Sequence, residues 1–181
     1  MPNYVGIFNL PSGPQWTCTP SEWCKEHCYT RKGRFRWDSI LQTHIWRYYQ
    51  SQDETFVQKM IDEIRRRLSI KYVRIHISGD FYSKKYIDKW ATIAHAFPDI
   101  IFRTNTRRVR FLKYMKKVFP SNVVVRESTD ITRKSHKVFP QAAIKGTPGS
   151  ENFFVCKDNC GECNFYCWHN PNVDVVTSQI R

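Results

Sequence analysis

Short apolar stretches that are typical of β-strands alternate with longer helical stretches over residues 1–130. β-Branched and aromatic residues dominate the strand-like stretches, whereas the stretches between them repeat apolar residues every three or four positions. The expected strands are Tyr4–Leu10, Tyr72–Ile77, Ile100–Thr106 and Asn122–Arg126, and the expected helices are Ser39–Arg67 in one or two pieces, Ser83–Phe97 and Val109–Val118. This alternation predicts βαβ units, a parallel sheet and an α/β fold.

Two architectures satisfy this order of elements, a partial (β/α) barrel or an open parallel sheet. We expect residues 1–130 to form the βα-repeat core. After residue 130 the periodicity fades, and residues 131–181 are expected to form an irregular, cysteine-rich C-terminal extension that packs on the core and binds metal. The carboxyl ends of parallel strands meet at one edge, so loops after the strands are the expected site.

The chain has seven cysteines, and they fall into two groups with none between Cys28 and Cys156. They are Cys18, Cys24 and Cys28 in the first group, and Cys156, Cys160, Cys163 and Cys167 in the second. No apolar stretch approaches the roughly 20 residues of a membrane span, and Met1–Leu10 lacks the pattern of a signal peptide. We therefore expect a cytoplasmic protein, in which clustered cysteines indicate metal binding or catalysis more than disulfides.

The spacing within the two groups predicts different kinds of centre. The second group packs four thiols into a compact run, which favours an iron–sulfur cluster and leaves zinc as the alternative. The first group offers three thiols, which would leave one iron of a [4Fe–4S] cluster without a protein ligand. His27 as a fourth ligand, or a cysteine shared from the second group, are further possibilities for the first centre.

The formal net charge of +13 predicts a polyanionic partner, with a nucleic acid or nucleotide as the leading expectation. Basic and aromatic residues alternate directly after the first cysteine group, around Arg31, Lys32, Arg34 and Arg36. This mixture suits stacking on unpaired bases and would equally shield a cluster from water. The sequence does not indicate an oligomeric state.

The first cysteine group, followed directly by Tyr29, resembles the S-adenosylmethionine radical enzymes. In that superfamily three cysteines hold a [4Fe–4S] cluster, and the open iron chelates S-adenosylmethionine. The resemblance implies that Ser78, Gly79 and Asp80, after the second strand, help to bind that cofactor through its amino group. From the residues alone, Asp80 could instead cap the helix that begins near Ser83.

The chain as a whole resembles phage- and plasmid-encoded proteins of the gene product 88 family. The similarity lies in residues 9–12, in Cys24-x3-Cys28-Tyr29, in residues 77–82 and in the closing Cys160-x2-Cys163-x3-Cys167-Trp168. The resemblance implies a fold more than a reaction, and it implies that the protein works in a host cytoplasm if it is phage-encoded.

Two functional hypotheses follow. The first is a small radical S-adenosylmethionine-like enzyme with an auxiliary cluster or structural metal in the second cysteine group, acting on a nucleic acid or nucleotide; its catalytic residues are not identified. The second is a non-catalytic module in which zinc or iron–sulfur centres fold the chain around a nucleic-acid-binding surface.

Overall fold

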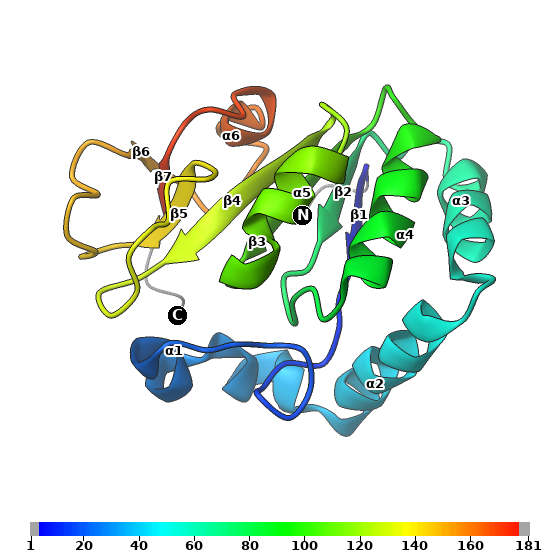
Figure 1. The fold of residues 1–181 in the computed structure, drawn as a ribbon, viewed down its shortest axis with the longest axis horizontal. Coiled ribbons are helices and arrows are strands. Elements are labelled where there is room, and N and C mark those ends of the chain that lie inside the picture. The colour runs from blue at the N-terminus through cyan, green and yellow to red at the C-terminus, as the bar shows by residue number, and fades with distance from the viewer. Residues whose placement is uncertain (1–3, 178–181) are drawn as a thin grey trace.

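The computed structural model describes residues 4–177 and contains a sheet of seven parallel strands in the order β1-β2-β3-β4-β5-β7-β6 (Figure 1). The strands are β1 (Val5–Phe8), β2 (Tyr72–Ile75), β3 (Ile101–Thr106), β4 (Val123–Thr129), β5 (Gln141–Ile144), β6 (Phe154–Val155) and β7 (Val175–Thr177). β1 and β6 lie at the two edges, so the α/β fold and the open parallel sheet are confirmed, and the sheet does not close into a barrel.

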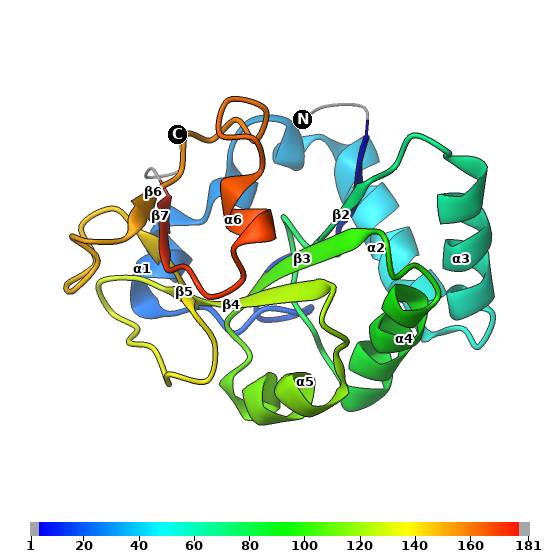
Figure 2. The ribbon, with the colours of Figure 1, turned by 90° about the horizontal axis from the view of Figure 1, so that it is seen from above.

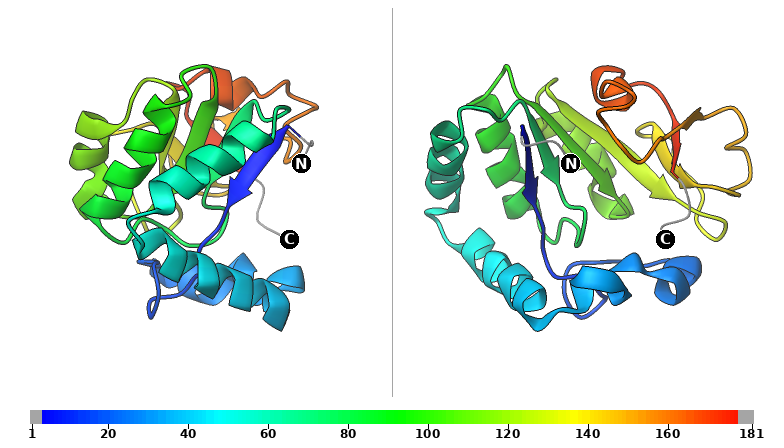
Figure 3. Two further views of the ribbon diagram at one scale, coloured as in Figure 1. Left: turned by 90° about the vertical axis from the view of Figure 1, so that its right-hand side faces the viewer. Right: turned by 180° about the vertical axis from the view of Figure 1, so that it is seen from behind.

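The helices occupy three places around this sheet. They are α1 (Glu22–His27), α2 (Asp38–Gln52), α3 (Phe56–Arg66), α4 (Lys84–His95), α5 (Leu112–Val118) and α6 (Tyr166–His169), with 3₁₀ turns η1 (Tyr29–Arg31), η2 (Gly33–Arg36) and η3 (Val109–Phe111). Seen from above, α4 and α5 lie on one side of β3 and β4, and α6 lies on the other (Figure 2). The segment from α1 to α2 lies beyond the edge at which the strands end, which we call the carboxyl edge (Figure 3).

The main hydrophobic core lies between the sheet and helices α3, α4 and α5. β1 to β4 follow one another in the sheet as they do in the chain, and right-handed crossovers therefore put their helices on the same face. The core includes Phe56 of α3, Trp90 of α4 and Met115 of α5, packed against Ile75 and Phe102 of the sheet. This packing is that of an α/β fold, as the alternation predicted.

The opposite face of the sheet is covered by the C-terminal part of the chain. Phe165 and Trp168 pack there against Tyr72 of β2, with the rings of Tyr72 and Phe165 stacked at 4.1 Å between centroids. α6 thus lies on the face of the sheet that α3, α4 and α5 do not cover. The cysteines that precede and follow Phe165 are thereby held close to the sheet.

The sequence predicted an irregular extension over residues 131–181, but residues 131–177 contain three strands. β5, β7 and β6 extend the same sheet, with β7 placed between β5 and β6. These strands contain four, three and two residues, which is too short for an alternating pattern to stand out. The boundary at residue 130 stays a prediction, and residues 178–181 lie outside the described chain. Within residues 4–177, no helix is long and apolar enough to cross a membrane.

Candidate functional site

A cavity of about 440 Å³ opens at the carboxyl edge of the sheet, and both cysteine groups contribute to its walls. Cys18, Cys24 and Cys28 line it from the loop after β1, and Cys156 and Cys160 line it from the chain after β6. Its size is typical of small-molecule and cofactor sites, and α/β proteins commonly bind ligands at this edge. The fold therefore brings together two groups of thiols that are far apart in the sequence.

Hydrogen bonds to the ends of neighbouring strands fix the first cysteine loop. The hydroxyl of Thr17 donates to the carbonyl of Pro11 at 2.8 Å and accepts from the amide of Asp80 at 3.0 Å. Ser21 is the N-cap of α1, because its hydroxyl accepts from the amide of Cys24 at 3.2 Å. The same hydroxyl donates to Asp130, after β4, at 2.5 Å. The loop is thus held across the carboxyl edge.

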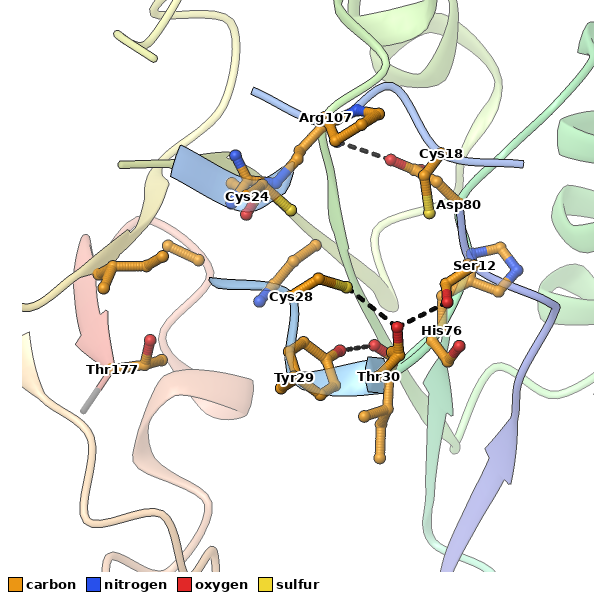
Figure 4. A pocket seen from close by; sticks show the side chains of 18 of the residues that line it. Ser12, Cys18, Cys24, Cys28, Tyr29, Thr30, His76, Asp80, Arg107 and Thr177 are labelled. Carbon is orange, nitrogen blue, oxygen red and sulfur yellow. Dashed lines mark hydrogen bonds between the residues drawn. The ribbon is translucent and has the colours of Figure 1, made fainter. Parts of the chain in front are cut away.

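The sulfur atoms of Cys18, Cys24 and Cys28 face the same space in Figure 4. A hydrogen bond from the Cys24 thiol lowers the pKa of Cys28 to about 5, and the same bond raises the pKa of Cys24. Burial raises the pKa of Cys18 to about 11. Thr30 stabilises the Cys28 thiolate further, because its hydroxyl lies 3.0 Å from the sulfur. These surroundings favour ionisation of Cys28 over that of Cys18 and Cys24, and the thiolate is the form that binds metals.

The second cysteine group runs from the residue after β6 into α6. Cys156 follows β6 directly, and Cys167 lies within α6, where its side chain is buried. Asn164 and Phe165 have positive φ angles, which turn the chain sharply between Cys163 and Cys167. Burial raises the pKa of Cys156 and Cys160, so these two thiols need a nearby cation or metal to ionise.

Three arginines from adjacent strands lie on the sheet face that carries the second cysteine group. Arg74 of β2 is opposite Arg103 of β3, and Arg126 of β4 is opposite Asn105 of β3. Among residues 4–177, none of the three has a carboxylate within ion-pair distance. Burial lowers the pKa of Arg74 to about 9 and that of Arg126 to about 10. A buried cation is costly unless negative charge lies nearby.

Two of these arginines, Arg103 and Arg126, instead contact the cysteine-rich segment. Arg103 donates from Nη1 to the sulfur of Cys167 at 2.7 Å, while its Nε has no partner. Arg126 donates to the carbonyls of Cys167, Asn170 and Val173 at 2.8, 2.9 and 3.0 Å. A zinc or iron–sulfur centre held by four thiolates carries net negative charge, and this cationic surface would stabilise it. The residues around the second group therefore fit an anionic metal–thiolate centre.

The side chains are not already gathered as a ligand set. In the part of the chain that the structure describes, no group of three or more His, Cys, Asp or Glu side chains is close enough to hold a metal ion. Binding would require the cysteine side chains of either group to move together. The metal-ligand role of all seven cysteines, Cys18, Cys24, Cys28, Cys156, Cys160, Cys163 and Cys167, therefore stays a prediction.

The turn of Ser78, Gly79 and Asp80 lines the same cavity and joins three strand ends. The hydroxyl of Ser78 donates to the carbonyl of Leu10 at 2.9 Å, across the end of β1. Gly79 has a φ of +82°, and a Cβ there would lie 2.6 Å from the Cβ of Leu10. Only glycine fits this position, because the backbone of the turn packs directly on the cysteine loop.

The carboxylate of Asp80 is buried and already has three donors. Oδ1 accepts from the amide of Phe81 and the hydroxyl of Thr106, both at 2.7 Å, and Oδ2 accepts from the amide of Arg107 at 2.8 Å. Asp80 does not cap α4, because Ser83 is the N-cap. Asp80 thus joins the ends of β2 and β3, and binding of an ammonium group by this turn stays a prediction.

Sequence reasoning missed Arg74, Arg126 and the place of His76 on the cavity wall. His76 is buried, lines the cavity and has a φ of +61°, with a partner only at Nε2, which lies 2.9 Å from the Tyr86 hydroxyl. Burial lowers its pKa to about 3, so the ring is neutral. An arginine in the middle of an apolar strand, as in VVVR, was the available signal for the buried cations.

Comparison of the chain with known proteins identifies its family. The chain is similar to the gene 88 protein of Mycobacterium phage L5, with 32% identity over 118 residues, which cover 57% of this chain and 49% of that protein. It is 30% identical over 141 residues to the gene 88 protein of Mycobacterium phage D29, covering 70% of this chain and 58% of that protein. The matching regions thus span about half the length of these relatives. No solved structure matches the chain.

The family model described as gene product 88 matches residues 1–159, which include Cys18, Cys24, Cys28 and Cys156. The phage relatives carry the same description in their names, and the matched region contains the whole of the first cysteine loop. The chain therefore belongs to the gene product 88 family.

Proposed function

We propose that this protein is an iron–sulfur protein and a small radical S-adenosylmethionine-like enzyme. Cys18, Cys24 and Cys28 hold a [4Fe–4S] cluster, and Cys156, Cys160, Cys163 and Cys167 hold an auxiliary cluster, with zinc as the alternative metal there. The observation that carries the proposal is that both cysteine groups line one cavity at the carboxyl edge of a parallel sheet. When bound, a [4Fe–4S] cluster with three protein ligands supplies electrons and an open iron for a cofactor.

The protein's own residues support such a centre in three ways. Thr17 and Ser21 hold the first loop across the strand ends, so its sulfur atoms face the cavity. Arg103 and Arg126 stabilise negative charge in the second group. The Ser78–Asp80 turn lies on the cavity wall, where we propose that it helps to place S-adenosylmethionine.

The first experiment is metal and acid-labile sulfide analysis after anaerobic purification, with an absorption spectrum. We expect iron and sulfide in equal amounts, corresponding to one or two four-iron clusters, and a broad band near ~400 nm. Cys28→Ser and Cys167→Ser should each remove about four irons if the groups hold separate clusters. Ser128→Ala, which changes a cavity-lining side chain without a sulfur, is the matched control and should keep all of the iron.

A second experiment separates a reactive cluster from a structural one. Addition of S-adenosylmethionine to the dithionite-reduced protein should change the EPR signal of the first cluster, and 5′-deoxyadenosine should form. Loss of both signals in Cys28→Ser, with the signal of the auxiliary cluster retained, would assign the reaction to the first group. An iron-replete wild-type protein that gives neither signal would refute the enzyme proposal.

One observation favours a second candidate function. The carboxylate of Asp80 is already occupied by three donors within the protein, as in a purely structural turn. On this view both cysteine groups are structural centres, of zinc or iron–sulfur, and the protein is a non-catalytic nucleic-acid-binding module. Zinc without sulfide in the first experiment would support this candidate.

A further inference from the structure

The segment that crosses the carboxyl edge exposes three large aromatic side chains. Trp37 precedes α2 directly, and Trp46 and Tyr49 lie within it; their exposed fractions are 59%, 60% and 60%. Trp and Tyr bury most of their surface in typical proteins. Several of them exposed on one segment indicate an interaction surface.

Trp46 and Tyr49 lie on one face of α2. They are three residues apart, a spacing that makes side chains neighbours on a helix. The buried residues of α2, His44 and Ser51, lie on the opposite face. The two rings therefore point away from the buried side of α2, although the ring of Tyr49 also contacts that of Tyr48 at 5.6 Å between centroids.

Four basic side chains lie directly before these rings. Arg31, Lys32, Arg34 and Arg36 are exposed, and none of them forms an ion pair within residues 4–177. Phe35, between Arg34 and Arg36, packs inward, because its ring contacts Tyr29 at 5.7 Å and His44 at 6.1 Å between centroids. With Phe35 turned inward, Arg34 and Arg36 on either side of it face the solvent.

We infer that this surface, formed by Arg31, Lys32, Arg34, Arg36, Trp37, Trp46 and Tyr49, binds single-stranded nucleic acid. The rings offer flat faces on which unpaired bases stack, and the cations contact the phosphates. Duplex bases are stacked on one another and cannot use these faces. Tyr29, Thr30 and Phe35 also line the cavity, so a strand bound here passes its mouth. The inference names the partner in the proposed function, whichever metal the cysteines hold.

The charge contribution is tested with a fluorescein-labelled oligothymidine of about 12 nucleotides, titrated at several salt concentrations. Arg34→Ser/Arg36→Ser should weaken binding and reduce the slope of log K against log salt by about 1.4, since each phosphate contact on a single strand contributes about 0.7. Lys116→Ser/Lys117→Ser, on exposed positions of α5, removes the same charge elsewhere and is the matched control. Equal losses in the two double variants would mean unspecific attraction and would overturn the inference.

The stacking contribution is tested with Trp46→Ala/Tyr49→Ala. We expect at least about tenfold weaker binding of the oligothymidine, and little change for a duplex of equal length. Iron and sulfide are measured on the same samples. If the variant binds oligothymidine more weakly but keeps the wild-type iron and sulfide content, the loss of affinity is due to this surface and not to loss of a cluster. Unchanged oligothymidine affinity would overturn the inference. It would also be overturned if the wild-type protein formed a concentration-dependent dimer and the variant lost that dimer while it kept its oligothymidine affinity.

Discussion

Arg126 holds the C-terminal cysteine segment against the sheet, and we expect Arg126→Met to destabilise the protein strongly. The guanidinium is fully buried and donates to the carbonyls of Cys167, Asn170 and Val173. Hydrogen bonds from a charged donor contribute about 1.5–3 kcal/mol each. Burial of the cation offsets part of that gain, as its lowered pKa indicates. Arg126→Met leaves the three carbonyls without this donor, at a cost of about 1–3 kcal/mol each, and relief from burying the cation offsets part of that cost. We therefore expect a loss of unfolding free energy of about 3–5 kcal/mol.

The assay is urea unfolding followed by tryptophan fluorescence, since Trp168 lies in the affected segment. Arg66→Met is the matched control: Arg66 is exposed and pairs only with Glu63 on the surface, so its loss should change stability by less than about 1 kcal/mol. Hydrogen exchange should accelerate in residues 166–173 of Arg126→Met before the rest of the sheet exchanges. A loss below about 1 kcal/mol, or unchanged exchange in that segment, would show that Arg126 does not hold it.

Three further predictions concern the cavity and its surroundings. Gly79→Ala should lower the unfolding free energy, measured in urea, by at least about 2 kcal/mol, because alanine has an unfavourable φ there and its Cβ meets Leu10. Gly146→Ala, at a φ of +93° with open space around it, has only the unfavourable φ and should lower the unfolding free energy by about 1–2 kcal/mol. Equal losses in the two variants would contradict the packing argument. Burial lowers the pKa of His44 to about 4, so the unfolded chain takes up a proton that the folded chain does not, and unfolding free energy should fall as the pH drops from about 6.5 toward 4. His44→Leu should make the fall of unfolding free energy with decreasing pH less steep. Identical profiles of unfolding free energy against pH for the variant and the wild-type protein would refute this role of His44. Arg103→Met should lower the metal content of the second cysteine group, measured as iron or zinc per chain, because Arg103 donates to Cys167; unchanged metal content would remove Arg103 from the site.

The sequence predicted the strands β1 to β4 and the helices α2 to α5, because the helices have periodic patterns with clear stops, but it did not predict α1 in the first cysteine loop. α4, for example, begins after the capping Ser83 and ends shortly before Pro98. The strands β5, β6 and β7 were missed because they are short and no clear helical pattern separates them, whereas β1 and β2, which are as short as β5, stand next to helical stretches. Their pairing is decided by tertiary contacts rather than by local preference.

The candidate site was predicted in part. Clustering identified the seven cysteines as a feature of interest, but no spacing rule indicates that two groups so far apart line one cavity. The buried arginines were missed for a physical reason: a single arginine in a strand normally points to solvent. Only the three-dimensional arrangement shows that α6 and the segment before it cover that face.

The position of β7 between β5 and β6 has a consequence for how the protein is made. Within residues 4–177, β6 is an edge strand that pairs with β7 alone, and β7 is synthesised after it. During translation β6, which directly precedes Cys156, therefore has no strand pairing until residues 175–177 have emerged. A nascent chain can complete the sheet from β1 to β4 and the first cysteine loop well before that moment. A chain stalled before β7 would therefore lack the strand that pairs with the segment leading to Cys156.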